Sequence, residues 1–382
     1  MFTPLARIFA GVIVIAFAVA NRPASAQHYY AYVAAESEDE VSLVHFDGSN
    51  ISVVQTIPVG IWPAEIEGPH GLTVSPDGRF WFVSIAHGNP YGSVYRYRTG
   101  TNERAGSATL GLFPASMHIS RATGLLYVVN FNLHGDMDPS TVSVVDPASM
   151  TELARTTTGI MPHGSRFSGD GLKHYSVSMM DGLLHELDAV TFEVSRSLHL
   201  DDALGLENEH REHAEGGEAA TAGMTMTPSR VKPTWAMPAP DGRHVYVAAN
   251  GAGRVVEISL ESWSIERVFE TAAGPYNIDV SPDGRYMVVT YKGADSTGIW
   301  DLESGRETAR VSNTKSVPHG VTVTPDSRYA FVTAEGVGSE PGAVDVIELP
   351  SGRRVASTDV GSQAGGIAFW QVVHAPLDLS GR

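Results

Sequence analysis

The sequence predicts an all-β fold, a seven-bladed β-propeller with four antiparallel strands in each blade. Two observations predict it. One phrase recurs along the chain at intervals of roughly 42–47 residues, which is the length of a four-stranded blade. The two ends of the chain also complement each other, because the first unit lacks an inner strand and the last one consists of an inner strand alone.

The recurring phrase combines a short apolar strand, a Pro-Asp-Gly turn and a second strand rich in β-branched and aromatic residues. It occurs at 68–83 and 274–289, and a third copy at 317–333 has Pro-Asp-Ser in its turn. Weaker copies cover 117–130, 161–178 and 233–250. Asp-Gly between alternating apolar residues favours a tight hairpin, because glycine accepts the positive φ of the turn. A third strand, such as 142–146 or 255–258, follows, and a fourth strand before the next copy completes each unit.

The ring is expected to close by sharing one blade between the two termini. Residues 28–59 hold three strands without an inner one, and residues 365–370 form an inner-type strand with nothing after it. Joining the two segments completes a seventh blade and leaves no sheet edge open. Residues 27–382 are therefore predicted to form one domain.

The turns and the strands after them resemble the YVTN-repeat (YncE-like) propellers. The resemblance rests on Val-Ser-Pro-Asp-Gly-Arg followed by Tyr-Val-type strands, and it extends over nearly all of 27–382. It implies the seven-bladed fold and leaves the function open, because binders, scaffolds and enzymes share that fold.

The first 26 residues have the three parts of a secretory signal peptide. Arg7 supplies the positive charge, residues 8–20 the apolar segment, and Ala24-Ser25-Ala26 a cleavage site, so cleavage is expected after Ala26. The apolar segment is shorter than the roughly 20 residues of a membrane span. We therefore expect a periplasmic or secreted protein, with no stable membrane insertion after signal cleavage.

Charge and composition exclude several classes of partner and chemistry. The formal net charge of −17 argues against nucleic acid as a partner, because nucleic-acid binding requires clustered lysine and arginine. The absence of cysteine excludes disulfides, iron–sulfur clusters and covalent haem. The Gly-x-Ser-x-Gly, P-loop and dinucleotide motifs are missing too. A small-molecule substrate, a metal ion or a periplasmic protein is the expected partner.

Three histidines occupy one position of the repeat, eight residues before the turn glycine, where the inner strand begins nearest the axis. In blades 1 to 7 this position holds Gly365, His70, Ser116, His163, Thr234, Tyr276 and His319. Blades 2, 4 and 7 are separated by two, three and two blades, the closest to trigonal that a seven-fold ring permits. Three converging imidazoles suit zinc or copper with one open position. The sequence therefore predicts an axial transition-metal site.

Nearby thioethers, at Met224, Met226 and Met237, favour copper over zinc. Two other interpretations stay open. The histidines could form a cluster that handles protons or binds a polar ligand, or Pro-His-Gly could be repeat consensus with a structural role.

Pro-His-Gly before a Ser-Pro-Asp-Gly-type turn, at His70, His163 and His319, is similar to the copper propellers of the nitrous oxide reductase and thiocyanate dehydrogenase kind. This resemblance implies copper held by histidines at the ends of inner strands. The chain departs from it by lacking an adjacent His-His pair and a full ring of histidines, which favours a mononuclear site. Streptogramin-lyase-like propellers also carry Gly-Pro-His-Gly, and that resemblance implies lactonase or lyase chemistry with a divalent ion.

Further ligands and catalytic groups are expected around the same position. His118 is a candidate deeper ligand and His134, beside Asp136, a candidate loop ligand. Tyr276 and Glu335 are the candidate catalytic residues, as a proton donor and a general base. Other polar residues in the loops after the second strands are candidates to support the ligands: His87, Asp181, Asn250 and Lys292.

An acidic insertion is expected at about 201–231, between blades 4 and 5, because the interval from His163 to Thr234 exceeds every other interval. We expect it on the face that bears the histidines, either as a solvated loop or as a lid. Residues 207–215 could form one or two helical turns with His210 and His213 on one face.

The sequence thus favours an exported metalloprotein, and it leaves open whether the protein is a copper oxidoreductase, a hydrolase or lyase, or no enzyme. The alternatives are a metal-free propeller that binds a ligand or protein, and a lactonase-like propeller that uses a divalent ion.

Overall fold

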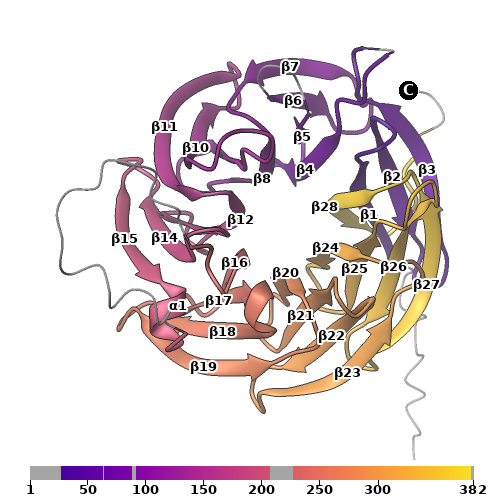
Figure 1. Cartoon of the computed structure of the whole chain (residues 1–382). Helices are drawn as coiled ribbons and strands as arrows, with labels where there is room; N and C mark the ends of the chain where they lie inside the picture. The colour runs from indigo at the N-terminus through magenta and orange to yellow at the C-terminus, as the bar shows by residue number, and fades with distance from the viewer. Residues whose placement is uncertain (1–26, 63, 88–91, 207–226, 380–382) are drawn as a thin grey trace, which may run out of the picture.

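Seven four-stranded sheets surround a central axis in the computed structural model, which describes residues 27–62, 64–87, 92–206 and 227–379. Within each sheet the inner strand faces the axis and the last strand lies at the rim (Figure 1). All neighbouring strands of a sheet are antiparallel. The predicted seven-bladed propeller is therefore confirmed.

The strands of a blade follow the chain from the axis outward, except in blade 1, where the C-terminal strand is innermost. Blade 1 contains β28 (Ala364–Val373), β1 (His28–Ala35), β2 (Glu40–Phe46) and β3 (Ile51–Pro58). Blade 2 contains β4 (Pro69–Val74), β5 (Phe80–Ile85), β6 (Ser93–Arg98) and β7 (Arg104–Thr109). Blade 3 contains β8 (Pro114–Ile119), β9 (Leu126–Asn130), β10 (Pro139–Asp146) and β11 (Thr151–Ile160). Blade 4 contains β12 (Pro162–Phe167), β13 (Lys173–Ser178), β14 (Leu183–Asp188) and β15 (Val194–His199).

The second half of the ring repeats this order. Blade 5 contains β16 (Pro233–Pro238), β17 (His244–Ala249), β18 (Arg254–Ser259) and β19 (Ser264–Glu270). Blade 6 contains β20 (Pro275–Val280), β21 (Tyr286–Tyr291), β22 (Ser296–Asp301) and β23 (Arg306–Ser312). Blade 7 contains β24 (Pro318–Val323), β25 (Tyr329–Ala334), β26 (Gly342–Glu348) and β27 (Arg353–Val360). The described helices are α1 (Leu200–Ala203) and a short 3₁₀ turn, η2 (Asn250–Ala252).

The ring closes in blade 1, as the sequence predicts. Strand β28 pairs with β1 from His28 opposite Val373 to Ala35 opposite Ala364. The C-terminal strand thus supplies the inner position that the N-terminal strands lack (Figure 1). This pairing removes the open edge that three strands alone would expose.

Apolar side chains fill the spaces between neighbouring blades. Between blades 7 and 1, Phe46 of β2 packs edge-on against Tyr329 and Phe331 of β25. Between blades 1 and 2, the buried Trp81 of β5 stacks on Tyr32 of β1. The rim strands differ, because β23 alternates exposed and half-buried residues along its length. This alternation is typical of a strand with one face in solvent.

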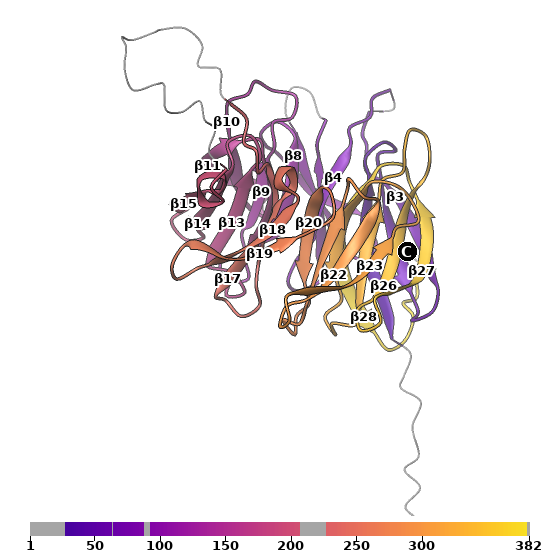
Figure 2. The same cartoon turned by 60° about the horizontal axis from the view of Figure 1, so that its bottom comes forward.

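Several predicted segments fall wholly or partly outside the described residues. These are the signal peptide at 1–26, and, within the insertion, His210, His213, Met224 and Met226. The described ends of the insertion are joined, because the Asp201 carboxylate accepts hydrogen bonds from the Ser229 hydroxyl and from the backbone N–H groups of Arg230 and Val231. Figure 2 shows the stacked inner and outer strands from the side. Among the described helices, none has the length and apolar character of a membrane span.

Candidate metal centre

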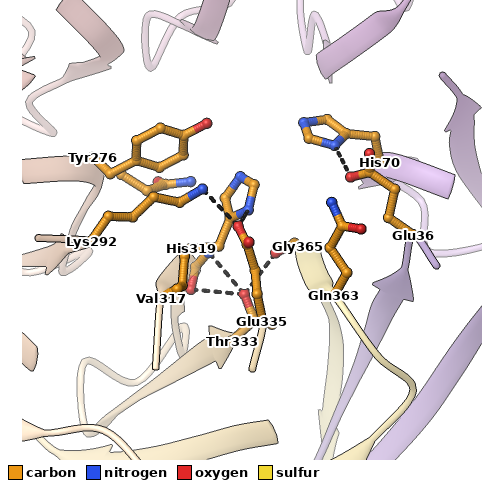
Figure 3. Close-up of polar contacts among 12 residues, drawn as sticks. Glu36, His70, Tyr276, Lys292, Val317, His319, Thr333, Glu335, Gln363 and Gly365 are labelled. Atoms are coloured by element: carbon orange, nitrogen blue, oxygen red, sulfur yellow. Dashed lines mark hydrogen bonds and ion pairs between the residues drawn. The ribbon is translucent and has the colours of Figure 1, made fainter. Parts of the chain in front are cut away.

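His70, His163 and His319 meet at the axis. Each is the second residue of an inner strand, in β4, β12 and β24. One ring nitrogen from each residue lies within 4.8 Å of the other two, and the residues are 9%, 2% and 6% exposed. Figure 3 shows His70 and His319 pointing into the same space. The structure therefore brings together the three histidines that the repeat alignment selects.

The glycine of each Pro-His-Gly lets neighbouring inner strands pack backbone to backbone. A Cβ at Gly71 would lie 1.9 Å from the carbonyl oxygen of Ala115 in the next blade. A Cβ at Gly320 would lie 2.6 Å from the carbonyl oxygen of Gly365. These contacts are shorter than any side chain tolerates, so glycine is required by the adjacent blade.

A threonine hydroxyl bridges the inner strands at two blade junctions, and one of these bonds holds the backbone of His319. The inner strands shift register just after the histidine position, which frees a backbone N–H. In blade 6, Thr290 accepts a hydrogen bond from the N–H of Asn277 (3.0 Å) and donates one to the carbonyl oxygen of His319 (2.9 Å). Thr333 donates in the same way to the carbonyl oxygen of Gly365 (2.7 Å), as Figure 3 shows. The backbone of His319 is thus tied to the blade before it.

Blade 3 corrects one element of the sequence alignment. Counting back from the turn glycine selects Ser116, but Ala115 is the second residue of β8 and occupies the histidine position. The cause is a longer turn, which closes from Ser120 to Gly124, whereas the turn in blade 4 closes over 168–171. The assignment of Ser116 to this position was therefore wrong.

Two of the three imidazoles are held by carboxylates, one buried (Glu36) and one half-buried (Glu335). Nδ1 of His70 lies 2.7 Å from Glu36, and Nδ1 of His319 lies 2.7 Å from Glu335 (Figure 3). A carboxylate accepts, so the imidazole proton resides on Nδ1 in both rings. Metal-binding histidines characteristically donate their second ring N–H to such an acceptor.

The third imidazole has a backbone acceptor instead. Nδ1 of His163 donates to the carbonyl oxygen of Thr234 at 3.0 Å, which places the lone pair on Nε2. The Tyr276 hydroxyl donates to that Nε2 at 2.9 Å. In all three histidines, Nε2 is therefore the nitrogen available to a metal, and Tyr276 competes for one of them.

Burial keeps two of the imidazoles neutral. It lowers the pKa of His163 well below its ordinary value, with His70 and His319 adding to the effect. Burial, followed by the Lys292 charge, lowers the pKa of His319 to about 4 although Glu335 opposes the change. Burial opposes ionisation of Glu335 too, but His319 and Lys292 outweigh it and lower the carboxyl pKa to about 2. Neutral imidazoles beside ionised carboxylates are the protonation states that metal binding requires.

Lys292 links Tyr276 to the carboxylate of blade 7. Its ammonium lies 2.6 Å from Glu335 and 4.0 Å from the centre of the Tyr276 ring. The Tyr276 ring in turn packs edge-on against His319, with 4.8 Å between ring centres. Of the two predicted catalytic residues, Tyr276 faces the axis and Glu335 lies behind His319 (Figure 3).

Glu36 is a residue of this centre that the sequence reasoning missed. Burial opposes its ionisation, but His70 and His87 hold the pKa of this carboxyl well below its usual range. Its second oxygen lies 2.7 Å from Nε2 of His87, and Nδ1 of His87 lies 2.9 Å from Nε2 of His134. A signal was present, because Ala-Glu ends the second strand of blade 1 just as it does at Glu335 in blade 7.

The other predicted candidates lie outside the three-histidine group. His134 is exposed, and its hydrogen bonds connect it to the group through His87 and Glu36. His118 accepts a hydrogen bond at Nδ1 from the backbone N–H of Phe167 (3.1 Å). Two loop candidates bind backbone groups: Asp181 the N–H of Ile160 and Asn250 the carbonyl oxygen of Pro275. Asp136 is exposed.

The dimensions of the site suit a transition metal after a small inward movement. Three atoms that lie within 4.8 Å of one another are at most about 2.8 Å from the point equidistant from all three, and metal–imidazole bonds are about 2.0–2.1 Å long. The rings would therefore move inward by less than about 1 Å, and Tyr276 would release His163. Such an arrangement leaves at least one coordination position open.

Comparisons with known proteins identify the fold. No protein-family model matches the chain, and no curated protein matches it by sequence. Among solved structures, the chain is similar to the periplasmic gluconolactonase of Pseudomonas aeruginosa, with a TM-score of 0.66 and 21% identity over 90% of this chain and 99% of that one. It is also similar to the hydrazine synthase of Kuenenia stuttgartiensis, with a TM-score of 0.57 and 20% identity over 76% of this chain and 80% of that one. At these identities, the similarity establishes the propeller architecture alone.

Proposed function

We propose that this chain is an exported metalloprotein whose His70, His163 and His319 hold one transition-metal ion at the propeller axis. The observation that carries the proposal is the Nδ1 hydrogen bond of every ring, to Glu36, to the Thr234 carbonyl and to Glu335. These bonds fix one tautomer and leave three Nε2 atoms directed at one point. Structural histidines of a repeat would not require three dedicated acceptors on the same ring atom.

In this proposal the metal supplies Lewis-acid or redox chemistry to a small-molecule substrate at the open position. Tyr276 is the catalytic residue, because its hydroxyl already reaches the Nε2 side of His163. Glu335 is a positioning residue, since both His319 and Lys292 bind its carboxylate. His118 and His134 are not ligands of this ion.

Copper is the metal that we favour. Neutral imidazole nitrogens suit both zinc and copper, and the general order of divalent-metal affinities places copper above zinc. Signal-peptide export would deliver the protein to the periplasm or the medium, where a periplasmic protein could serve as its partner.

Metal analysis of the mature protein, purified after export and without metal-chelating resin, tests the proposal. We expect about one copper or zinc per chain in the wild type, and loss of that metal in His163→Ala. His134→Ala is the matched control and should retain it. A metal content in His163→Ala equal to that of the wild type would contradict the site, and absence of metal from every variant, with no binding on copper or zinc addition, would favour a metal-free binding propeller.

Lactone hydrolysis with a divalent ion is the second candidate function. The fold similarity to a gluconolactonase, over 99% of that chain, favours testing it. Gluconolactone hydrolysis above the spontaneous rate, lost in His163→Ala, would support this candidate. A rate equal to that of buffer in the presence of magnesium, calcium, zinc and copper would eliminate it.

A further inference from the structure

A cavity of about 30 Å³ extends from the three histidines into the interior of the ring. Besides the histidines, its lining includes Arg166, Trp235 and Asn277. The volume accommodates about two water-sized groups. The proposed metal and these three side chains therefore share one small space.

Arg166 brings an unpaired positive charge to this cavity. It lies on β12, three residues after His163, and its guanidinium stacks 4.5 Å from the centre of the Trp235 ring. It donates a hydrogen bond to the carbonyl oxygen of Ser165 (2.8 Å), and no carboxylate of the described residues lies within ion-pair distance of it. A poorly solvated charge without a counter-ion is costly.

The surroundings of Arg166 show how little compensates its charge. Burial lowers its pKa to about 10, and Asp279 is the acid that opposes this effect. The Asp279 carboxylate itself accepts hydrogen bonds from the backbone N–H groups of Val323 (2.7 Å) and Val280 (2.9 Å). The guanidinium thus remains available to a ligand.

Two further polar atoms in the cavity wall lack a hydrogen-bond partner among the described residues. They are Nε1 of Trp235 and Oδ1 of Asn277, in residues that are 6% and 4% exposed. Buried donors and acceptors are almost always satisfied, so each unpartnered atom calls for a ligand or an ordered water. Trp235 and Asn277, which line the same cavity as Arg166, thus bring one unpartnered donor and one unpartnered acceptor to its wall.

We propose that this cavity binds a small anion, held between the open position of the metal and the Arg166 guanidinium. The Trp235 N–H donates to the anion, and Asn277 accepts from a proton of the anion or from a water that accompanies it. This inference rests on the proposed function, because it assigns the substrate class of the same site. Arg166 is the charged side chain among the described residues that line the cavity, and neutral histidines and a metal cation add no negative charge to that lining, which selects an anion.

Azide is a suitable probe, because it is a linear monovalent anion of three atoms. Its affinity would be measured by isothermal titration calorimetry on the copper-loaded and the metal-free protein, in the wild type, Arg166→Gln, Trp235→Phe and Arg310→Gln. Trp235→Phe keeps an aromatic face for the guanidinium and removes the indole N–H. Arg310, ion-paired to Glu307 on the rim strand β23, is the matched control.

We expect Arg166→Gln to weaken azide binding by about 10- to 100-fold in both forms, since hydrogen bonds to charged groups contribute about 1.5–3 kcal/mol. Trp235→Phe should weaken it several-fold, about the value of one neutral-donor hydrogen bond, and Arg310→Gln should leave it unchanged.

If Arg166→Gln does not fold, the azide affinity of Trp235→Phe decides. Equal affinity in wild type and variants, or no azide binding by the wild type, would overturn the anion site while copper binding still stands. Arg166-dependent azide binding by a protein that takes up no copper would retain the anion site and reject the metal centre.

Discussion

At the scale of single residues, the candidate centre depends on what lies behind each imidazole. Glu36, the Thr234 carbonyl and Glu335 each accept the Nδ1 proton of one ring. A fixed ring orientation lowers the entropic cost of assembling three ligands, and a charged acceptor increases the basicity of the opposite nitrogen. The supporting residues are therefore expected to affect metal affinity without touching the ion.

Glu335→Gln tests this expectation. The amide keeps the size of the side chain and an acceptor oxygen but removes the charge that faces His319 and Lys292. We expect copper affinity to fall by about 10- to 100-fold, measured by competition with a chromophoric chelator. Glu348→Gln, at the end of β26, serves as the matched control. An affinity within twofold of the wild type would show that the carboxylate does not support the ligand.

His174 allows a pH prediction away from the site. Its side chain is buried on β13, and neither ring nitrogen has a hydrogen-bond partner among the described residues. Burial, followed by the Arg166 charge, lowers its pKa to about 3. The groups packed around it are Tyr127, Phe167 and the half-buried His118.

The direction in which pH changes the stability follows from proton uptake by the unfolded chain. As pH falls below about 6.5, the unfolded chain binds a proton at His174 while the native chain does not until about pH 3, so stability falls with pH in that window. The free energy of unfolding should therefore fall from pH 7 to pH 5 in both proteins, but by about 2 kcal/mol less in His174→Phe than in the wild type. Urea denaturation at both pH values measures this difference. Parallel stability losses in the two proteins would contradict the assigned burial of a neutral histidine.

At the scale of strands, the histidines are positioned by hydroxyl groups that tie one blade to the next. Thr290 of β21 satisfies both a free N–H in its own blade and the carbonyl oxygen of His319 in the next. The register shift at the start of the inner strand creates this free N–H. The same hydroxyl group thus satisfies the irregular strand of blade 6 and positions His319 in blade 7.

Thr290→Val removes this connection while nearly preserving shape. It leaves a buried donor and a buried acceptor unpaired, so we expect the free energy of unfolding to fall by about 2 kcal/mol and the copper affinity to fall as well. Thr56→Val, on the exposed face of β3, should change neither quantity. Chemical denaturation and chelator competition on both variants measure the effects. A Thr290 variant that matches the Thr56 control would contradict the positioning role.

At the scale of the whole molecule, the fold could be read from the sequence because it is a repeat of local signals. Each hairpin carries its own turn chemistry, and the complementary ends at 28–59 and 364–373 indicate how the ring closes. The histidine trio was predictable for the same reason, since equal positions in equal blades meet at the axis. The signal peptide and the centre of the insertion remain predictions.

The features of the site that could not be predicted from the sequence depend on irregular turns and on contacts between blades. One extra residue in the turn at 120–124 shifted the alignment of blade 3. Glu36 lies in the blade shared by the termini, where the repeat is hardest to align. The cavity wall combines Arg166 with Trp235 and Asn277, the third residues of β16 and β20, which stand where Pro-His-Gly has its glycine, and only the packed ring shows that the three share one cavity.

X-ray absorption spectroscopy of the copper- or zinc-loaded protein tests the central claim most directly. The three-histidine site predicts three imidazole nitrogens at about 2.0 Å, with the multiple scattering of imidazole rings and one further light-atom ligand. In His163→Ala, the imidazole contribution should fall to two rings or the metal should be lost. A shell made mainly of oxygen atoms, or a spectrum unchanged in His163→Ala, would contradict a metal centre at the axis.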